Sequence, residues 1–239
     1  MNRARLNGDC PAHMLVFLVT FLLLASIQVA HAQFEGIVES NNLTIDETGS
    51  PQKYVMTMWI KTNMIKVKTA SSGAIPSSTM IYRNDKRTVW ILNDEDKTYF
   101  EIPQSEQAQN VDSIPKWPPP DDYEIQKSGK KKKILGYACE QVFIKRADQE
   151  TEIWGTKELV HLFRAISEAL GDDRIEDAND WTDEIMKMGL FPLISSTKIE
   201  GHLVESQEVT RIEHLTLSQE MFELPVGYEK ENPRKVLRN

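Results

Sequence analysis

Residues 54–69 read YVMTMWIKTNMIKVKT, and this stretch is the strongest indication of the fold. Its two arms are rich in strand-forming residues and are separated by Thr62-Asn63, a connection short enough for a tight β-hairpin. On the first arm, the two faces of the strand carry Tyr54, Met56, Met58 and Ile60 on one side and Val55, Thr57 and Trp59 on the other. Both faces are apolar, whereas a strand with one solvated face alternates apolar and polar residues. Each face therefore needs a cover, which can be helices, a second layer or an apolar ligand.

The same short, β-rich pattern extends from Phe34 to Ile102 and returns after residue 122. Turn-forming residues separate the runs at 84–86 and 93–96, because Asn and Asp tolerate tight-turn backbone. The pattern predicts an antiparallel meander rather than alternating strands and helices. The predicted strands are 34–40, 54–61, 64–69, 79–83, 88–92, 98–102, 123–127, 131–135, 139–146, 151–154, 191–200 and 202–212.

Two amphipathic stretches predict helices that cover the sheet. The first runs from about Thr156 to Leu170 and repeats apolar residues at helical spacing. Its apolar face carries Leu159, Phe163 and Ile166. The second is shorter and is marked by Trp181, Ile185 and Met188.

Residues 104–122 are polar and then proline-rich, ending near Trp117 and Pro118-Pro119-Pro120. This segment can form neither a helix nor a central strand. It is either a boundary between two small domains or a long loop that crosses within one sheet. Because each half alone would bury little surface, we expect one half-barrel domain over residues 33–228 and a charged, flexible tail at 229–239.

The first 32 residues have the order of a secretory signal peptide. Arg3 and Arg5 precede an apolar run from Met14 to Ala25, and Ala30-His31-Ala32 is a typical cleavage site. That run is shorter than the roughly 20 apolar residues of a membrane-spanning helix. We therefore expect cleavage near Ala32, a periplasmic or secreted protein, and no transmembrane segment in the mature chain; an uncleaved anchor is the alternative.

The charge of the chain bears on which kinds of macromolecule it can bind. The formal net charge is −8 and no basic stripe runs along the chain, which argues against nucleic-acid binding. One exception is the run Lys130–Lys133, which is either a solvated strand edge or a site for an anionic surface. With Cys10 in the signal peptide, Cys139 is the single cysteine of the mature chain, and its apolar setting predicts a buried thiol.

The sequence carries no recognisable catalytic or metal-binding motif. It has no HExxH, cysteine pair, GxSxG elbow, P-loop or GxGxxG fingerprint. We therefore expect no catalytic residues, no metal and no cofactor, and a protein that is not an enzyme. An enzyme acting on a lipid in the same cavity is the third alternative, which no constellation of residues supports.

Three groups of residues carry a resemblance to a known family. They are Met56, Met58 and Ile60 with Asn63–Lys66; Ile134–Glu140 with Thr151–Leu159; and Gly189–Leu193 with Phe222–Tyr228. Together these resemble a family of exported bacterial proteins that is known only as a domain of unknown function. Its organisation is similar to that of the periplasmic outer-membrane lipoprotein carrier superfamily. The resemblance implies an α+β fold in which a strongly curved antiparallel sheet, an incomplete β-barrel, has two or three helices over its open mouth and can hold acyl chains.

The leading hypothesis is a non-enzymatic exported protein that binds an apolar ligand, such as a lipid, an acyl chain or a lipoprotein. The predicted walls of the site are Met56, Met58, Ile60, Trp90 and Leu92, and the predicted lid is Leu159, Phe163 and Ile166. Since a strand alternates faces, a shift of one residue would exchange Met58 for Trp59. The alternative is a ligand-free interaction module that meets a protein partner through the proline-rich loop, with Trp117 as its anchor.

Overall fold

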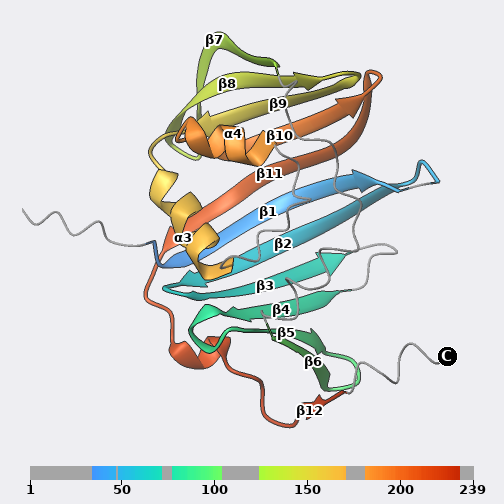
Figure 1. Cartoon of the computed structure of the whole chain (residues 1–239), viewed down its shortest axis with the longest axis vertical. Helices are drawn as coiled ribbons and strands as arrows, with labels where there is room; N and C mark the ends of the chain where they lie inside the picture. Colours follow the sequence, from blue (N-terminus) through green and yellow to red (C-terminus); the bar gives the residue numbers. More distant parts are fainter. Residues whose placement is uncertain (1–33, 47, 72–76, 104–123, 171–180, 232–239) are drawn as a thin grey trace, which may run out of the picture. The chain divides into compact units, whose positions relative to one another are not determined.

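The computed structural model describes residues 34–46, 48–71, 77–103, 124–170 and 181–231, which all belong to one compact unit, Gln33–Asn239. The fold is mostly β: one curved sheet in the strand order β12-β6-β5-β4-β3-β2-β1-β11-β10-β9-β8-β7 (Figure 1). Its two end strands, β12 and β7, do not pair with each other, so the sheet formed by the described residues is not closed into a barrel. The expected α+β class is thus corrected to a β fold with few helices, although the open, curved sheet was anticipated.

The N-terminal strands form the antiparallel meander that the turn residues predict. These strands are β1 (Gly36–Ile45), β2 (Pro51–Lys61), β3 (Met64–Ser71), β4 (Ser78–Arg83), β5 (Thr88–Asn93) and β6 (Thr98–Pro103). The β2–β3 turn has Asn63 at φ 59°, the left-handed conformation that asparagine adopts readily. A 3-10 turn, η1 (Asn84–Lys86), joins β4 to β5.

The remaining strands add to the sheet on the other side of β1. They are β7 (Glu124–Ile134), β8 (Tyr137–Arg146), β9 (Gln149–Thr156), β10 (Phe191–Ile199) and β11 (His202–His214). β11 pairs with β1, so the last long strand lies beside the first in the middle of the sheet. The two strands expected at 123–127 and 131–135 are one strand, β7, with an irregularity between Lys127 and Lys131.

Two segments cover the two faces of the sheet. Helices α3 (Val160–Leu170) and α4 (Trp181–Lys187) lie on one face, which we call the helix face (Figure 1). Residues 215–228, with the 3-10 turn η3 (Gln219–Phe222), cover part of the opposite face, which we call the tail face. The tail then adds β12 (Glu229–Lys230) parallel to β6, so the flexible tail that was expected from residue 229 begins as a paired strand.

Each cover has its own buried core. Under α3, the side chains of Leu159, Leu162 and Ala165 pack with Ile60 and Ile65 of the sheet. Under α4, Ile185 packs with Val142, Ile144 and Ile153. On the tail face, Leu217 and Phe222 pack with Met64, Ile81, Trp90 and Leu92. The apolar character of both strand faces in residues 54–61 is therefore explained by two covers rather than one.

Three expectations fall outside the described residues: the signal peptide, the proline-rich loop at 104–122 with Trp117, and most of the charged tail. Within the described part of the chain, no helix is long and apolar enough to cross a membrane.

Candidate apolar binding surface

A row of apolar side chains crosses five strands on the helix face. The register pairs Met58 of β2 with Val67, Val67 with Met80, Met80 with Ile91, and Ile91 with Phe100 of β6. Partners that are directly opposite in a sheet project from the same face, so the five side chains form one continuous strip. We call Met58, Val67, Met80, Ile91 and Phe100 the methionine row.

The methionine row is only half buried, although every member is apolar. The next row on the same face is Ile60, Ile65, Tyr82, Val89 and Ile102, and it is more deeply buried. Ile60 and Ile65 are 0% and 1% exposed because α3 packs on them. The helix thus buries the β2 and β3 members of this row, Ile60 and Ile65, and leaves the adjacent methionine row partly open along its margin.

The geometry of the methionine row suits an elongated apolar molecule. Four steps between strands, at about 4.8 Å each, give a length of about 19 Å. One leaflet of a bilayer holds acyl chains over about 15 Å, half of its hydrocarbon thickness. Methionine adds an adaptable, polarisable side chain that conforms to varied apolar shapes.

A polar border lies on the far side of the methionine row. The row beyond it is Ser40, Met56, Thr69 and Ser78. The hydroxyls of Thr69 and Ser78 are 2.8 Å apart, and the side-chain amide of Asn42 donates to the Ser40 hydroxyl at 3.0 Å. The surface is therefore amphipathic, with an apolar strip bounded by hydroxyl groups.

Four of the predicted wall and lid residues are partly accessible on the helix face: three lie beside or within the methionine row, and one lies in the polar border. Met58 belongs to the methionine row, and Met56 lies in the polar border. Phe163 and Ile166 of α3 are half buried and pack against the edge of the helix-face core. Ile60 and Leu159 are also on this side, but at 0% and 1% exposed they fill the core rather than line a site.

The structure separates Trp90 and Leu92 from the other predicted wall residues. On β5 the helix face carries Val89 and Ile91, while Trp90 and Leu92 point to the tail face and are buried with Leu217 and Phe222. The predicted wall residues of β5 are therefore displaced by one position from those on the helix face. The cause is that β5 is apolar on both faces, so the alternation of residues does not show which face turns toward the helices.

Sequence reasoning missed Val67, Met80, Ile91 and Phe100. Each stands in a predicted strand, but only the cross-strand register shows that the four continue Met58. Two signals that could have found part of the row are the hairpin at 62–63, which fixes the register of β2 with β3, and the turn at 84–86, which fixes that of β4 with β5.

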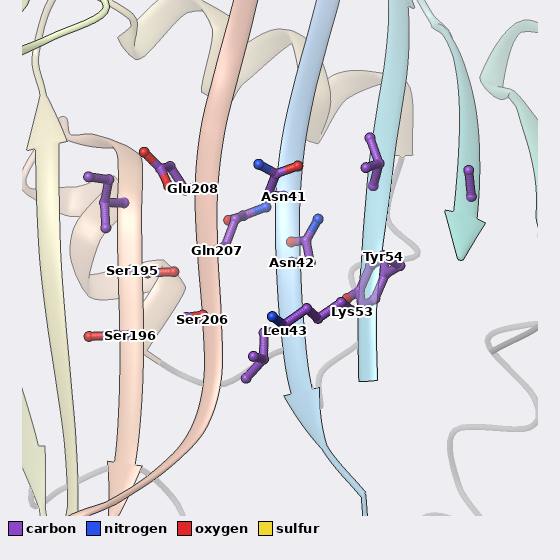
Figure 2. A pocket seen from close by; sticks show the side chains of 13 residues that line it. Asn41, Asn42, Leu43, Lys53, Tyr54, Ser195, Ser196, Ser206, Gln207 and Glu208 are labelled. Atoms are coloured by element: carbon purple, nitrogen blue, oxygen red, sulfur yellow. The ribbon is translucent and has the colours of Figure 1, made fainter. Parts of the chain in front are cut away.

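A separate hollow of about 680 Å³ lies over the middle of β1, β2, β10 and β11 (Figure 2). Its lining is mixed: Asn41, Asn42, Leu43, Lys53, Tyr54, Val55, Ala70, Ile194, Ser195, Ser196, Ser206, Gln207 and Glu208. Most of these residues, including Asn41, Lys53 and Glu208, alternate onto the tail face, and none of the lining residues belongs to the covering segment 215–228. None of the predicted site residues lines this hollow.

Among the described residues, no group of three His, Cys, Asp or Glu side chains is close enough to hold a metal ion. Cys139 is buried, and burial raises the pKa of its thiol, so it matches the expectation of an inert core cysteine. Burial lowers the pKa of His161, and the nearby His214 lowers it further.

Comparison with known proteins gives a family without an activity. Residues 34–228 match the family described as a domain of unknown function, DUF4412. None of the curated proteins gives a significant match.

Similar solved structures are distant in sequence. An uncharacterized conserved protein from Thermus thermophilus is 8% identical, with a TM-score of 0.45, over 89% of this chain and 98% of that one. A LolA superfamily protein from Nitrosomonas europaea is 11% identical, with a TM-score of 0.32, over 85% and 96%. MucB, in its complex with MucA, is 12% identical, with a TM-score of 0.39, over 80% and 55%.

Proposed function

We propose that this chain, which belongs to the family of unknown function DUF4412 over residues 34–228, is an exported, non-enzymatic protein that binds an apolar ligand such as a lipid acyl chain. The ligand would lie along the methionine row, beside α3, with Phe163 and Ile166 as the movable side of the site. The polar end of the ligand would contact the hydroxyl groups of Thr69 and Ser78 in the polar border.

The observation that carries this proposal is the half-open methionine row. Five neighbouring apolar side chains on five strands are left partly accessible next to a helix that buries Ile60 and Ile65 of the adjacent row. Contiguous exposed apolar surface in a protein of this kind marks a binding site more often than scattered single residues do. Burial of an acyl chain contributes about 0.8 kcal/mol per methylene, so the ligand needs few polar contacts.

Export is part of the proposal and is supported by the signal-peptide pattern of residues 1–32. A carrier in an aqueous compartment must shield the apolar part of its cargo, and the margin of α3 provides that shelter. Among the described residues, no polar cluster on the helix face suggests chemistry on the ligand, so we propose binding and transfer rather than catalysis.

The test is uptake of a fluorescent fatty acid by the protein from Gln33 onward, with lipid extraction of the purified protein. Met80→Glu and Ile91→Glu place a charge in the middle of the methionine row and are expected to weaken binding at least tenfold, because a buried charge without a partner is costly. Leu203→Glu is the matched control, since Leu203 is 40% exposed on β11 and away from the row.

A thermal melt of each variant separates loss of the site from loss of the fold. Equal uptake by Ile91→Glu and wild type would refute the placement of the ligand. Absence of any bound lipid, together with no uptake of added fatty acid by the wild type, would refute the function itself.

A further inference from the structure

β7 combines an unusual concentration of positive charge with a position at the end of the sheet. Lys130–Lys133 are all exposed on this strand, which pairs only with β8 among the described strands (Figure 1). The β7–β8 hairpin, residues 124–146, has seven basic and two acidic residues, a formal net charge of +5, in a chain of net charge −8. The charge of this hairpin is therefore opposite to that of the molecule.

In the part of the chain that the structure describes, three of the four lysines in this run have no carboxylate partner. Among the described residues, none forms an ion pair with Lys130, Lys131 or Lys133. Glu140, the cross-strand neighbour of Lys131, lies 4.0 Å from the ammonium group of Lys157 instead. Lys132 lies over the ring of Trp154, 4.1 Å from its centroid, which holds its stem against the sheet while the charge stays at the surface.

Exposed apolar side chains stand next to these lysines. Leu135, at the tip of the β7–β8 turn, is 45% exposed, and Val160, the first residue of α3, is 41% exposed. The backbone amide of Ala138 donates to the carboxylate of Glu158 at 2.8 Å, which fastens the hairpin to the start of α3. Leu135 and Val160 thus belong to one corner of the molecule, beside the lysine run.

We infer that this corner, Lys130–Lys133 with Leu135 and Val160, docks the protein on the surface of a bilayer that contains anionic phospholipids. Exposed lysines attract the phosphate groups, and the two apolar side chains enter the boundary between headgroups and acyl chains. An acidic protein would satisfy the lysines but would need a matching apolar pocket for the leucine at the hairpin tip, whereas a bilayer accepts an apolar side chain without one. Pairing of another strand with the free edge of β7 is disfavoured by the lysines themselves.

The acidity of the rest of the molecule does not oppose this docking. Charges are screened over about 8 Å at physiological ionic strength. β1 is five strands away from β7, or about 24 Å at the usual strand spacing. A membrane that contacts the corner is therefore screened from the acidic residues of β1 and the strands beyond it, and Glu158 is a nearby carboxylate that reduces the local charge.

The experiment is flotation of the protein from Gln33 onward with vesicles of phosphatidylcholine alone or of equimolar phosphatidylcholine and phosphatidylglycerol. We expect binding only to the anionic vesicles and a decrease in binding with salt. Each lysine near an anionic surface contributes roughly a fivefold factor, so Lys130→Gln with Lys131→Gln should reduce the partition coefficient about 25-fold. The matched control is Lys53→Gln with Lys68→Gln, which removes the same charge from exposed positions on β2 and β3.

The outcomes separate the alternatives. An equal loss in the control pair, or no binding to anionic vesicles, would overturn the inference. Leu135→Ser should weaken binding to vesicles but not binding to soluble polyglutamate. If polyglutamate binds as tightly as vesicles do, and Leu135→Ser changes neither affinity, the surface binds an acidic protein instead and the inference is overturned. Ile91→Glu, which tests the methionine row, should leave flotation unchanged, so failure of docking is distinguishable from failure of ligand binding.

Discussion

Arg83 of β4 is the side chain whose loss should most clearly detach the covering tail from the sheet. It is 1% exposed, and its guanidinium donates at 2.8 and 2.7 Å to both carboxylate oxygens of Asp85. It also donates to the backbone carbonyl of Phe222 at 3.1 Å and pairs with Glu223 at 2.6 Å. One side chain therefore connects the β4–β5 turn to the tail that buries the tail face.

The expected cost of Arg83→Met follows from what each partner would lose. The Phe222 carbonyl would become a buried acceptor without a donor, which costs about 1–3 kcal/mol. Asp85 and Glu223 are 36% and 40% exposed, so water replaces much of what they lose, and the roughly 3–5 kcal/mol typical of breaking a fully buried pair is an upper limit. We expect a loss of about 3 kcal/mol in the free energy of unfolding, or roughly 6–12 °C in Tm for a domain of this size.

The assay is urea unfolding followed by tryptophan fluorescence, since the Trp90 ring lies 5.8 Å from the Arg83 guanidinium. Lys86→Met is the matched control, because Lys86 also pairs with Glu223, at 2.8 Å, but is exposed; its loss should cost less than about 1 kcal/mol. If Arg83→Met were no more destabilising than Lys86→Met, the tail would not depend on this contact.

The pH dependence gives a second check on Arg83. Its hydrogen bonds hold the pKa of Asp85 below the ordinary value of 3.8. A carboxyl group whose pKa is lower in the folded state stabilises the fold at pH values above its unfolded pKa. This stabilisation is lost as the pH falls through the folded pKa. The difference between wild type and Arg83→Met should therefore be largest near neutral pH and shrink below about pH 4.

Three further predictions concern single positions. Gly36→Ala should cost about 3 kcal/mol in unfolding experiments, because an added methyl group would lie 2.0 Å from the backbone carbonyl oxygen of Glu213 on β11. Gly155→Ala should cost less than half of that, because its methyl group would lie 3.1 Å from the nearest atom, the Cβ of Leu190. Cys139 should resist a thiol reagent in the native protein and react at once in urea, since it is 2% exposed and burial raises its pKa; rapid native labelling would contradict this packing. The pKa of Asp46 should be about 2 in an NMR titration, because Thr48, Ser50 and Gln52 donate hydrogen bonds to its carboxylate, and an ordinary midpoint near 3.8 would show that this turn is not formed in solution.

The sequence allowed the meander to be predicted because its signals are local. Short polar connections such as Thr62-Asn63 and 84–86 limit where the chain can reverse, and the spacing of Leu159, Phe163 and Ile166 marks α3. Local signals failed to predict the end of a strand where neighbouring strands on both sides extend the pairing. The strand predicted at 34–40 ends before Asn41 and Asn42. These two residues continue β1 because they pair with β2 on one side and with β11 on the other.

The candidate site was harder to predict from the sequence because it depends on which side chains of each strand lie on the helix face and which on the tail face. Met58 could be chosen from its own strand, but the continuation through Met80 to Phe100 exists only once the register of four pairs is known. Trp90 and Ile91 are equally apolar, and residues far along the chain, at 215–228, decide that Trp90 is covered on the tail face. Face assignment in a strand that is apolar on both sides is therefore a tertiary property.

The pairing of β1 with β11 has a consequence for how the molecule forms. Gly36 lies opposite His214, so the middle of the sheet is a contact between the two ends of the folding unit. Such non-local pairing slows folding, because the entropy of closing a long loop is lost before the contact is gained. A growing chain can complete the β1–β6 meander early, but β1 must keep an open edge until β11 has been synthesised. Folding should therefore be a late, whole-chain event, and any truncation before residue 202 should leave an aggregation-prone half sheet rather than a smaller stable domain.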